Sequence, residues 1–190
     1  MPAPEGGVWL VTGAQASGKS TVAELLASSF ERGVHVRGGQ FYRWVTSGWT
    51  HFDDADQDEA RRLLDLRYRL SAQVADEYAA AGFTSVVQDN IYGDDVVRWL
   101  AGLCCSSRRL VVLDPAVHIV AERDADRVAA TGKVAYVNGF TPEANVSSLR
   151  STPRDLGLWL DTSAQSPEET VAEILDRHAE ARVESSKREA

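Results

Sequence analysis

Covalent and metal-bound crosslinks have little support in this sequence. Its 190 residues include only two cysteines, the adjacent Cys104 and Cys105, and four histidines. Neighbouring Cα atoms lie about 3.8 Å apart, which is too close for ordinary disulfide geometry. We therefore expect two buried structural thiols, rather than a disulfide or a vicinal redox pair, and a cytoplasmic location. No histidine has a partner at the spacing of zinc ligands, so we expect no zinc site.

Long apolar runs and an excess of positive charge are also lacking. No apolar run approaches the length of a membrane span, and residues 1–7 lack the basic start and apolar middle of a signal peptide. The formal net charge of −8 disfavours general binding to nucleic acid or to an anionic membrane. We therefore expect neither of these as a partner, whereas the oligomeric state stays open.

The most informative feature present is a loop with two glycines. It reads Gly13-Ala14-Gln15-Ala16-Ser17-Gly18-Lys19-Ser20 and fits the phosphate-binding pattern G-x-x-x-x-G-K-[ST] at every constrained position. An apolar run precedes it and a helix-prone run begins at Thr21, which predicts a strand, a tight turn and a helix N-terminus. We expect all eight loop residues and Thr21 to bind the nucleotide. Lys19 would contact the β- and γ-phosphates, and Ser20 would ligate Mg²⁺.

Short β-prone runs alternate with helical patterns along the chain. Strands are predicted over Val8–Thr12, Gly33–Val36, Thr84–Gln88, Arg109–Leu113 and Leu158–Leu160. Helices are predicted after the loop, around Leu63–Tyr78, and over Asp94–Leu100, Ala116–Ala130, Pro142–Leu149 and Pro167–Ala179. This order predicts an α/β fold, with a five-stranded parallel sheet between two layers of helices. We expect one domain over residues 1–190, with frayed ends at 1–7 and 182–190.

Ser166-Pro167-Glu168-Glu169 is typical of a helix start, with a capping serine, a proline and two acids in the first turn.

Two aspartates follow predicted strands, at the sheet edge where ligands bind. Asp89 follows the third strand, where a carboxylate could hold Mg²⁺ or accept a proton from an attacking hydroxyl. The alternative for Asp89 is a cap on the next turn. Asp114 follows the fourth strand, but Pro115 comes next, so we favour a helix-capping role there.

Arginines four residues apart mark a second group of candidates. Arg123 and Arg127 share one face of a predicted helix, and Lys133 follows in a segment over residues 131–141 that we expect to form a lid. Such cations could stabilise the charge of a transferring phosphoryl group. Acids lie among them, so a solvated ion-pair face is the alternative.

The acceptor would bind after the second strand. The stretch Arg43–Phe52 is unusually aromatic, and its aromatic walls with one fixed cation suit a polar organic molecule. We assign Gln40, Arg43, Trp44 and Tyr92 to this site. For Trp44, packing in the core is the alternative.

These residues together resemble the P-loop small-molecule kinases, and above all the chloramphenicol phosphotransferase-like proteins. Shikimate, gluconate and nucleotide kinases and the zeta-toxin kinases are further off. The resemblance covers most of the chain, and it rests on Gly13–Ser20, Val34–Gly38, Val87–Asp89, the cations from Arg123 to Lys133, and Gly157–Ser163. It implies transfer of the γ-phosphoryl group of ATP, with Mg²⁺, to a hydroxyl of a small molecule, and it places Thr162 and Ser163 near the adenine.

The chain departs from this family at one point. Many of these kinases carry a catalytic aspartate just after the second strand, where this sequence has Gly38-Gly39-Gln40. Either Asp89 supplies the base, or the loose transition state of phosphoryl transfer needs little base help. Two further functions stay open: a nucleotide-binding regulatory protein or slow ATPase, and a toxin-type kinase of nucleotide sugars.

Overall fold

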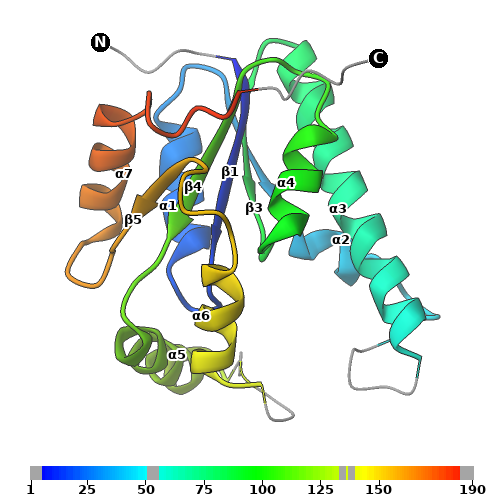
Figure 1. The fold of residues 1–190 in the computed structure, drawn as a ribbon, viewed down its shortest axis with the longest axis vertical. Coiled ribbons are helices and arrows are strands. Elements are labelled where there is room, and N and C mark those ends of the chain that lie inside the picture. Colours follow the sequence, from blue (N-terminus) through cyan, green and yellow to red (C-terminus); the bar gives the residue numbers. More distant parts are fainter. Residues whose placement is uncertain (1–5, 51–55, 133–135, 137–139, 185–190) are drawn as a thin grey trace.

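A five-stranded parallel sheet forms the centre of the molecule (Figure 1). The computed structural model describes residues 6–50, 56–132, 136 and 140–184. The strands are β1 (Gly7–Gly13), β2 (Gly33–Arg37), β3 (Thr84–Gln88), β4 (Arg108–Leu113) and β5 (Leu158–Leu160). Their order in the sheet is β2-β3-β1-β4-β5. This arrangement confirms the predicted α/β class and places β3 beside β1.

The central strand β1 is apolar along most of its length because both of its faces are covered. Every residue from Gly7 to Gly13 is buried. Leu10 lies opposite Val87 of β3 and Leu110 of β4. A parallel strand buried on both faces is expected to carry consecutive apolar residues rather than an alternating pattern.

Helices cover the two faces of the sheet, each over its own core. On one face lie α1 (Lys19–Ser28) and α7 (Pro167–Asp176); Trp9 and Val11 belong to the core that they cover. On the other face lie α3 (Gln57–Ala80), α4 (Asp94–Ala101) and α6 (Pro142–Arg150). Val8 and Leu10, which alternate with Trp9 and Val11 along β1, belong to this second core. This alternation produces the three layers.

Two more helices lie near the carboxyl ends of the strands, α2 (Gly39–Arg43) and α5 (Val117–Thr131) (Figure 1). The five-residue α2 was not predicted, because so short a helix shows no apolar period. Predicted Lys133 and most of the predicted lid lie outside the described residues.

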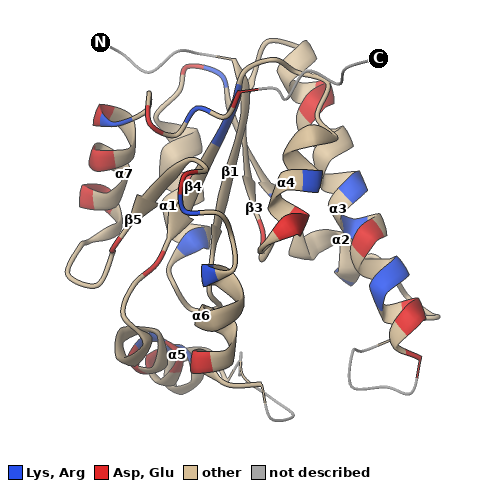
Figure 2. Ribbon diagram, in the orientation of Figure 1, with Lys and Arg blue, Asp and Glu red and all other residues tan. Residues whose placement is uncertain are grey.

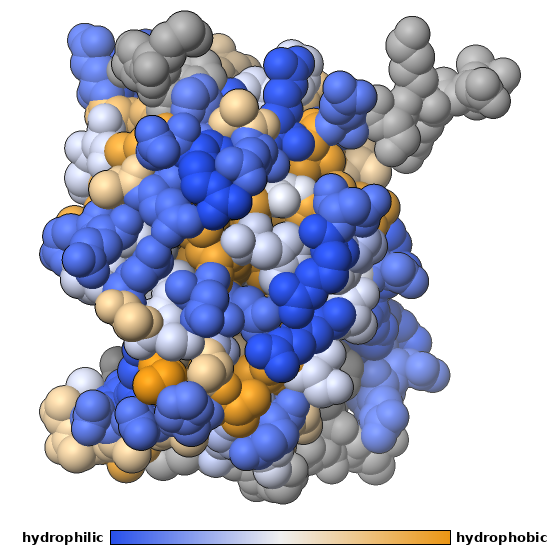
Figure 3. All heavy atoms as spheres, turned by 60° about the vertical axis from the view of Figure 1, so that its left-hand side comes forward, coloured by the Kyte–Doolittle hydropathy of each residue, from blue (hydrophilic) through white to orange (hydrophobic). Residues whose placement is uncertain are grey.

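The surface over α7 and β5 is mostly hydrophilic, with small apolar patches between charged side chains (Figure 3). Figure 2 shows acidic residues along α7, on the opposite side of the sheet from α2 and α3. None of the described helices combines the length and apolar character needed to cross a membrane.

The chain after α7 is ordered against the sheet as far as it is described. Arg182 pairs with Arg109 in an antiparallel bridge, and the Val183 N–H donates to the Arg108 carbonyl at 3.0 Å. Residues 182–184 belong to the end that was expected to fray, but the backbone of Arg182 and Val183 pairs with β4.

The two cysteines are free thiols, as expected, but they are not both buried. Cys104 is exposed and Cys105 is partly exposed. Their N–H groups donate to the Asp76 carboxylate at 2.7 and 3.0 Å, which holds this turn at the surface. The expectation of two buried thiols was therefore wrong, since neither Cys104 nor Cys105 is buried.

The start of α7 confirms the capping signal. The Ser166 hydroxyl accepts the Glu169 N–H at 3.1 Å, and the Glu169 carboxylate accepts the Ser166 N–H at 2.8 Å. Pro167 occupies the first turn. This reciprocal arrangement is a capping box, which satisfies two otherwise unpaired N–H groups.

Ser166→Ala should lower the free energy of unfolding by about 1 kcal/mol, because it removes the acceptor of the cap. Chemical denaturation measures the change. Ser28→Ala is the control, since its exposed hydroxyl bonds only within α1; we expect about 0.5 kcal/mol or less there. Equal stability of wild type and Ser166→Ala would contradict the capping role.

Candidate functional site

A pocket of about 530 Å³ lies at the carboxyl ends of the strands. Residues of the loop after β1, of α2, α3 and α5, and of the chain around the ends of β2 and β3 line it. They are Gln15, Ala16, Gly18, Lys19, Ser20, Thr21, Arg37, Gly39, Gln40, Arg43, Arg67, Gln88, Asn90, Arg123 and Arg127. Six of these are cationic, and none of the described lining residues is acidic. A protein of net charge −8 therefore holds a basic cavity.

The loop between β1 and α1 has the conformation that its glycines predict. Gly18 has a φ of +93°, in the left-handed region that glycine adopts at little cost. Gly13 has no room for a side chain, because a Cβ atom there would lie 2.7 Å from the Leu113 carbonyl oxygen. The tight turn brings Lys19 and Ser20 to the first turn of α1. Such a helix N-terminus favours a bound anion.

Three side chains from distant parts of the chain hold the loop from behind. The Tyr92 hydroxyl donates to the Gly13 carbonyl at 3.0 Å and accepts from the Asn145 amide at 3.2 Å. Asn145 also accepts the Gln15 N–H at 2.6 Å, and the Tyr136 hydroxyl donates to the Gln15 carbonyl at 2.7 Å. Burial raises the pKa of the Tyr92 hydroxyl, so it stays a donor. Tyr92 was expected in the acceptor site, but it is not among the described lining residues and supports the loop instead.

Lys19 is almost completely buried at the centre of the pocket. Its Nζ donates to the Ala14 carbonyl at 2.6 Å. Burial, and then the nearby positive charges of Arg127 and Arg67, lower the pKa of Lys19 to about 7. A phosphate bound beside Nζ would restore the charged form.

The two arginines of α5 share one face, as predicted, and both line the pocket. Arg123 donates to the Ser17 carbonyl at 3.3 Å and to the Thr162 carbonyl at 2.8 Å, so it is already bonded to the loop. Arg127 pairs with Asp124 on the same helix, while its Nε is buried without a partner. Arg127 therefore forms the ion pair that was expected as the alternative to a role in the site, and it also lines the pocket.

Asp89 is engaged with an arginine that the sequence did not reveal. It is fully buried, and Arg67 of α3 bonds both carboxylate oxygens, with Nε at 3.0 Å from Oδ2 and Nη2 on Oδ1. The Asn90 N–H donates to the same carboxylate at 2.7 Å. Arg67 lines the pocket, whereas Asp89 does not appear among the described lining residues. The expected base or metal ligand is thus the buried partner of Arg67.

Gly38 makes room for this ion pair. A Cβ atom at Gly38 would lie 1.9 Å from Oδ2 of Asp89, so the carboxylate fills the space of a side chain there. The glycine at position 38 and the acid at the end of β3 therefore depend on one another.

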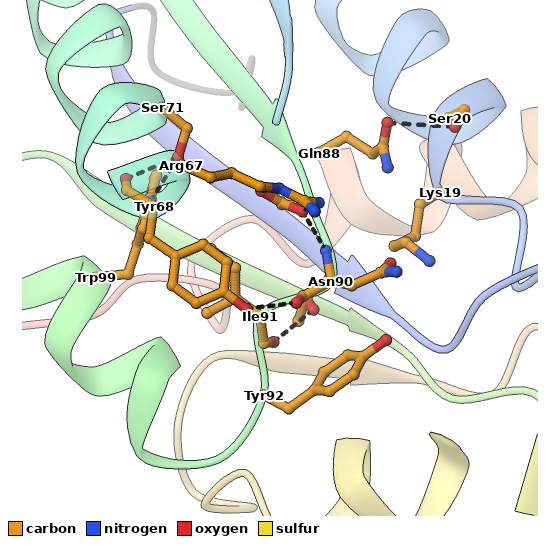
Figure 4. A network of polar contacts seen from close by, with 12 residues as sticks. Lys19, Ser20, Arg67, Tyr68, Ser71, Gln88, Asn90, Ile91, Tyr92 and Trp99 are labelled. Carbon is orange, nitrogen blue, oxygen red and sulfur yellow. Dashed lines mark hydrogen bonds and ion pairs between the residues drawn. The ribbon is translucent and has the colours of Figure 1, made fainter. Parts of the chain in front are cut away.

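Gln88, rather than Asp89, faces the serine of the loop. The Ser20 hydroxyl donates to the Gln88 amide oxygen at 3.2 Å (Figure 4). No group of three or more acids, histidines or cysteines with metal-binding geometry occurs in the part of the chain that the structure describes. The chain therefore offers a metal two neutral oxygens at this point.

On the acceptor side, the structure places two of the predicted residues in the pocket. Gln40 and Arg43 of α2 line it. Trp44 is 65% exposed, and it packs edge-to-face on Phe41 at 5.2 Å between ring centroids instead of facing the cavity. Tyr42 lies under the Arg67 guanidinium, at 4.7 Å from its ring centroid.

The ends of β4 and β5 carry structural contacts. The Ser163 hydroxyl accepts the Ala116 N–H at 2.8 Å, next to the start of α5. Thr162 is buried and meets Arg123 through its carbonyl. Asp114 does not cap α5, which begins after Ala116; it pairs with Arg150 and Arg154, each at 3.0 Å. The capping role predicted for Asp114 was wrong because two distant arginines reach it.

Comparison with known proteins places this fold in a recognised group. The family model described as an AAA domain matches residues 3–146, and the chain belongs to that family. A sugar kinase of Janibacter sp. HTCC2649 is 19% identical, with coverage of 94% of this chain and 96% of that one and a TM-score of 0.64. The APS kinase of Mycobacterium tuberculosis, solved with AMPPNP and APS, is 21% identical, with coverage of 93% and 99% and a TM-score of 0.62.

The tunicamycin resistance protein of Deinococcus radiodurans is 15% identical, covers 94% of this chain and 98% of its own, and has a TM-score of 0.64. None of the curated protein sequences matches this chain. The expected likeness to P-loop small-molecule kinases is confirmed in the fold.

Arg67→Gln should destabilise the protein by about 3 kcal/mol, because it leaves the Asp89 charge buried without its cation. The double variant Arg67→Gln/Asp89→Asn should recover part of this loss. Denaturant unfolding measures both. Arg62→Gln, on the exposed side of the same helix, is the control; equal effects of Arg62→Gln and Arg67→Gln would contradict the role of the pair.

ATP binding at about pH 8 should take up close to one proton. Lys19 in the free protein, with a pKa of about 7, is mostly neutral at this pH. Bound phosphates raise its pKa above the pH of the solution, so that it takes up a proton. Calorimetry in buffers of different ionisation enthalpy counts the protons. Lys19→Met should bind ATP more weakly and without this uptake; the same uptake in both proteins would show that Lys19 is not the group involved.

Proposed function

We propose that the protein is an ATP-dependent kinase that transfers the γ-phosphoryl group to a hydroxyl of a small molecule. The observation that carries the proposal is the basic pocket itself, in which the buried Lys19 and the loop lie opposite a second wall formed by α2 and α3. The fold shared with a sugar kinase and an APS kinase supports it. A cytoplasmic location stays a prediction.

The loop and α5 would hold the nucleotide. The loop N–H groups and Lys19 would bind the β- and γ-phosphates, and Arg123 would fix the loop to the end of β5. Arg127 would move from Asp124 to the transferring group, where the charge spreads over three oxygens in the transition state. Thr162 and Ser163 would lie toward the adenine, as the family resemblance implies.

Magnesium fits this site only as a companion of the nucleotide. Ser20 and Gln88 would hold it through their oxygens, and phosphates would supply the charged ligands. When bound, Mg²⁺ neutralises charge on the phosphates. Asp89 would act through Arg67, because both of its oxygens are engaged there. Phosphoryl transfer through a loose transition state would then need no carboxylate base.

A slow ATPase or nucleotide-dependent regulator is the second candidate. It is favoured by the lack of an acidic group among the described lining residues. Incubation with γ-labelled ATP and a panel of sugars, nucleosides, hydroxylated acids and antibiotics separates the two. Label on an organic acceptor supports the kinase, and label released only as inorganic phosphate supports the alternative.

Arg127→Ala should lower kcat by about 10²-fold or more and change the acceptor KM less, because its charge matters most in the transition state. Steady-state kinetics with the labelled acceptor measures both constants. Arg177→Ala, at the end of α7, should leave them unchanged. An unchanged kcat in Arg127→Ala would assign Arg127 to the ion pair with Asp124 alone.

A further inference from the structure

The basic character of the pocket extends well beyond the loop. Three of its six cations come from β2, α2 and α3, and no described lining residue carries a negative charge. They are Arg37, Arg43 and Arg67. Arg37 is 59% exposed and paired with Glu24 at 2.8 Å, whereas the Arg67 side chain is only 13% exposed and its partner Asp89 is buried. Arg43 is the third cation, and a neutral acceptor would leave it without a counter-charge among the described lining residues.

Arg67 is built to present a fixed guanidinium. Asp89 takes Nε and Nη2 in a two-pronged contact, and the Tyr42 ring supports the face of the group. Only 13% of the Arg67 side chain is exposed, and it is exposed where it lines the pocket. A guanidinium held at one edge can use its remaining N–H groups for a planar anion with little further loss of conformational freedom.

Arg43 has the opposite character. Its side chain makes no hydrogen bond or ion pair with any residue that the structure describes, although it lines the same pocket from α2. Gln40, three residues earlier on α2, lies on the same face and also lines the cavity. An unpaired arginine beside an amide is suited to bind an incoming acidic group.

The cations also act on one another. The positive charge of Arg67 contributes to the lowered pKa of Lys19. The cation of the α2–α3 wall is therefore close enough to the loop lysine for the two charges to repel. Triphosphate would neutralise the loop side, through Lys19, Arg123 and Arg127. On the α2–α3 side Asp89 offsets the charge of Arg67, and Arg43 would keep its positive charge.

We propose that the acceptor carries an anionic group of its own, a phosphate, sulfate or carboxylate, and that Arg43 and Arg67 bind it. This inference rests on the proposed kinase function and narrows its substrate class. The hydroxyl that accepts the phosphoryl group would belong to the same molecule, and the anion would anchor it against the α2–α3 wall.

A calorimetric titration tests whether this wall binds an anion. The full chain is first saturated with AMPPNP and Mg²⁺, so that the loop is occupied, and is then titrated with sulfate, inorganic phosphate or acetate at constant ionic strength. The wild-type complex should bind at least one of these probes, and the probe that binds most tightly identifies the class of anion. Arg43→Gln should weaken this binding about 10-fold or more, the loss of one charge-assisted hydrogen bond.

Two further variants keep the test clear of folding effects. Arg67→Gln/Asp89→Asn removes the guanidinium without leaving a buried charge, and it should weaken probe binding to a similar degree. Arg62→Gln removes the same charge from the exposed side of α3 and should bind as wild type does. AMPPNP affinity should stay close to wild type in all three.

Failure of the loaded wild type to bind any probe, or equal binding by wild type and Arg43→Gln, would overturn the inference. If the assay with γ-labelled ATP then showed transfer of label to a neutral acceptor, the proposed kinase function would still hold. Failure of AMPPNP itself to bind would overturn the proposed function and this inference together.

Discussion

The concentration of positive charge at one end of the sheet is the constraint on which the site depends. Like charges in a partly buried cavity repel, and the protein offsets this without placing an acid in the described lining. Each partner instead comes from behind the cavity wall: Asp89 for Arg67, Asp124 for Arg127, Glu24 for Arg37, and backbone carbonyls for Lys19 and Arg123. These five cations are thus held in place where they line the pocket, whereas the sixth, Arg43, has no such partner among the described residues.

The same end of the sheet depends on contacts between distant parts of the chain. The loop after β1 is supported by Tyr92, which follows β3, and by Asn145 on α6. The parallel order of the strands brings these segments together, because their carboxyl ends meet at one edge. Tyr136 adds a third contact to the loop, at Gln15. The fold therefore prepares the loop before any nucleotide arrives.

The sequence predicted those features that are local. The loop, the five strands and the cap of α7 each depend on residues within a few positions of one another, so their patterns are visible without a structure. The contacts that set the roles of side chains are not local. Arg67 lies 22 residues from Asp89, and Arg150 lies 36 residues from Asp114. The residues next to either aspartate in the sequence do not indicate its arginine partner. A base or metal ligand was therefore expected at Asp89, and a helix cap at Asp114.

The lack of a side chain at position 38, directly after β2, follows from the same geometry. Asp89 and a side chain at position 38 would occupy one volume, since a Cβ there would come within 1.9 Å of the carboxylate. A carboxylate can therefore stand at position 38 or reach the same place from β3, but not both. In this chain it comes from β3, and it brings Arg67 with it. Glycine at position 38 thus leaves room for a buried acid that fixes a cation in the pocket wall.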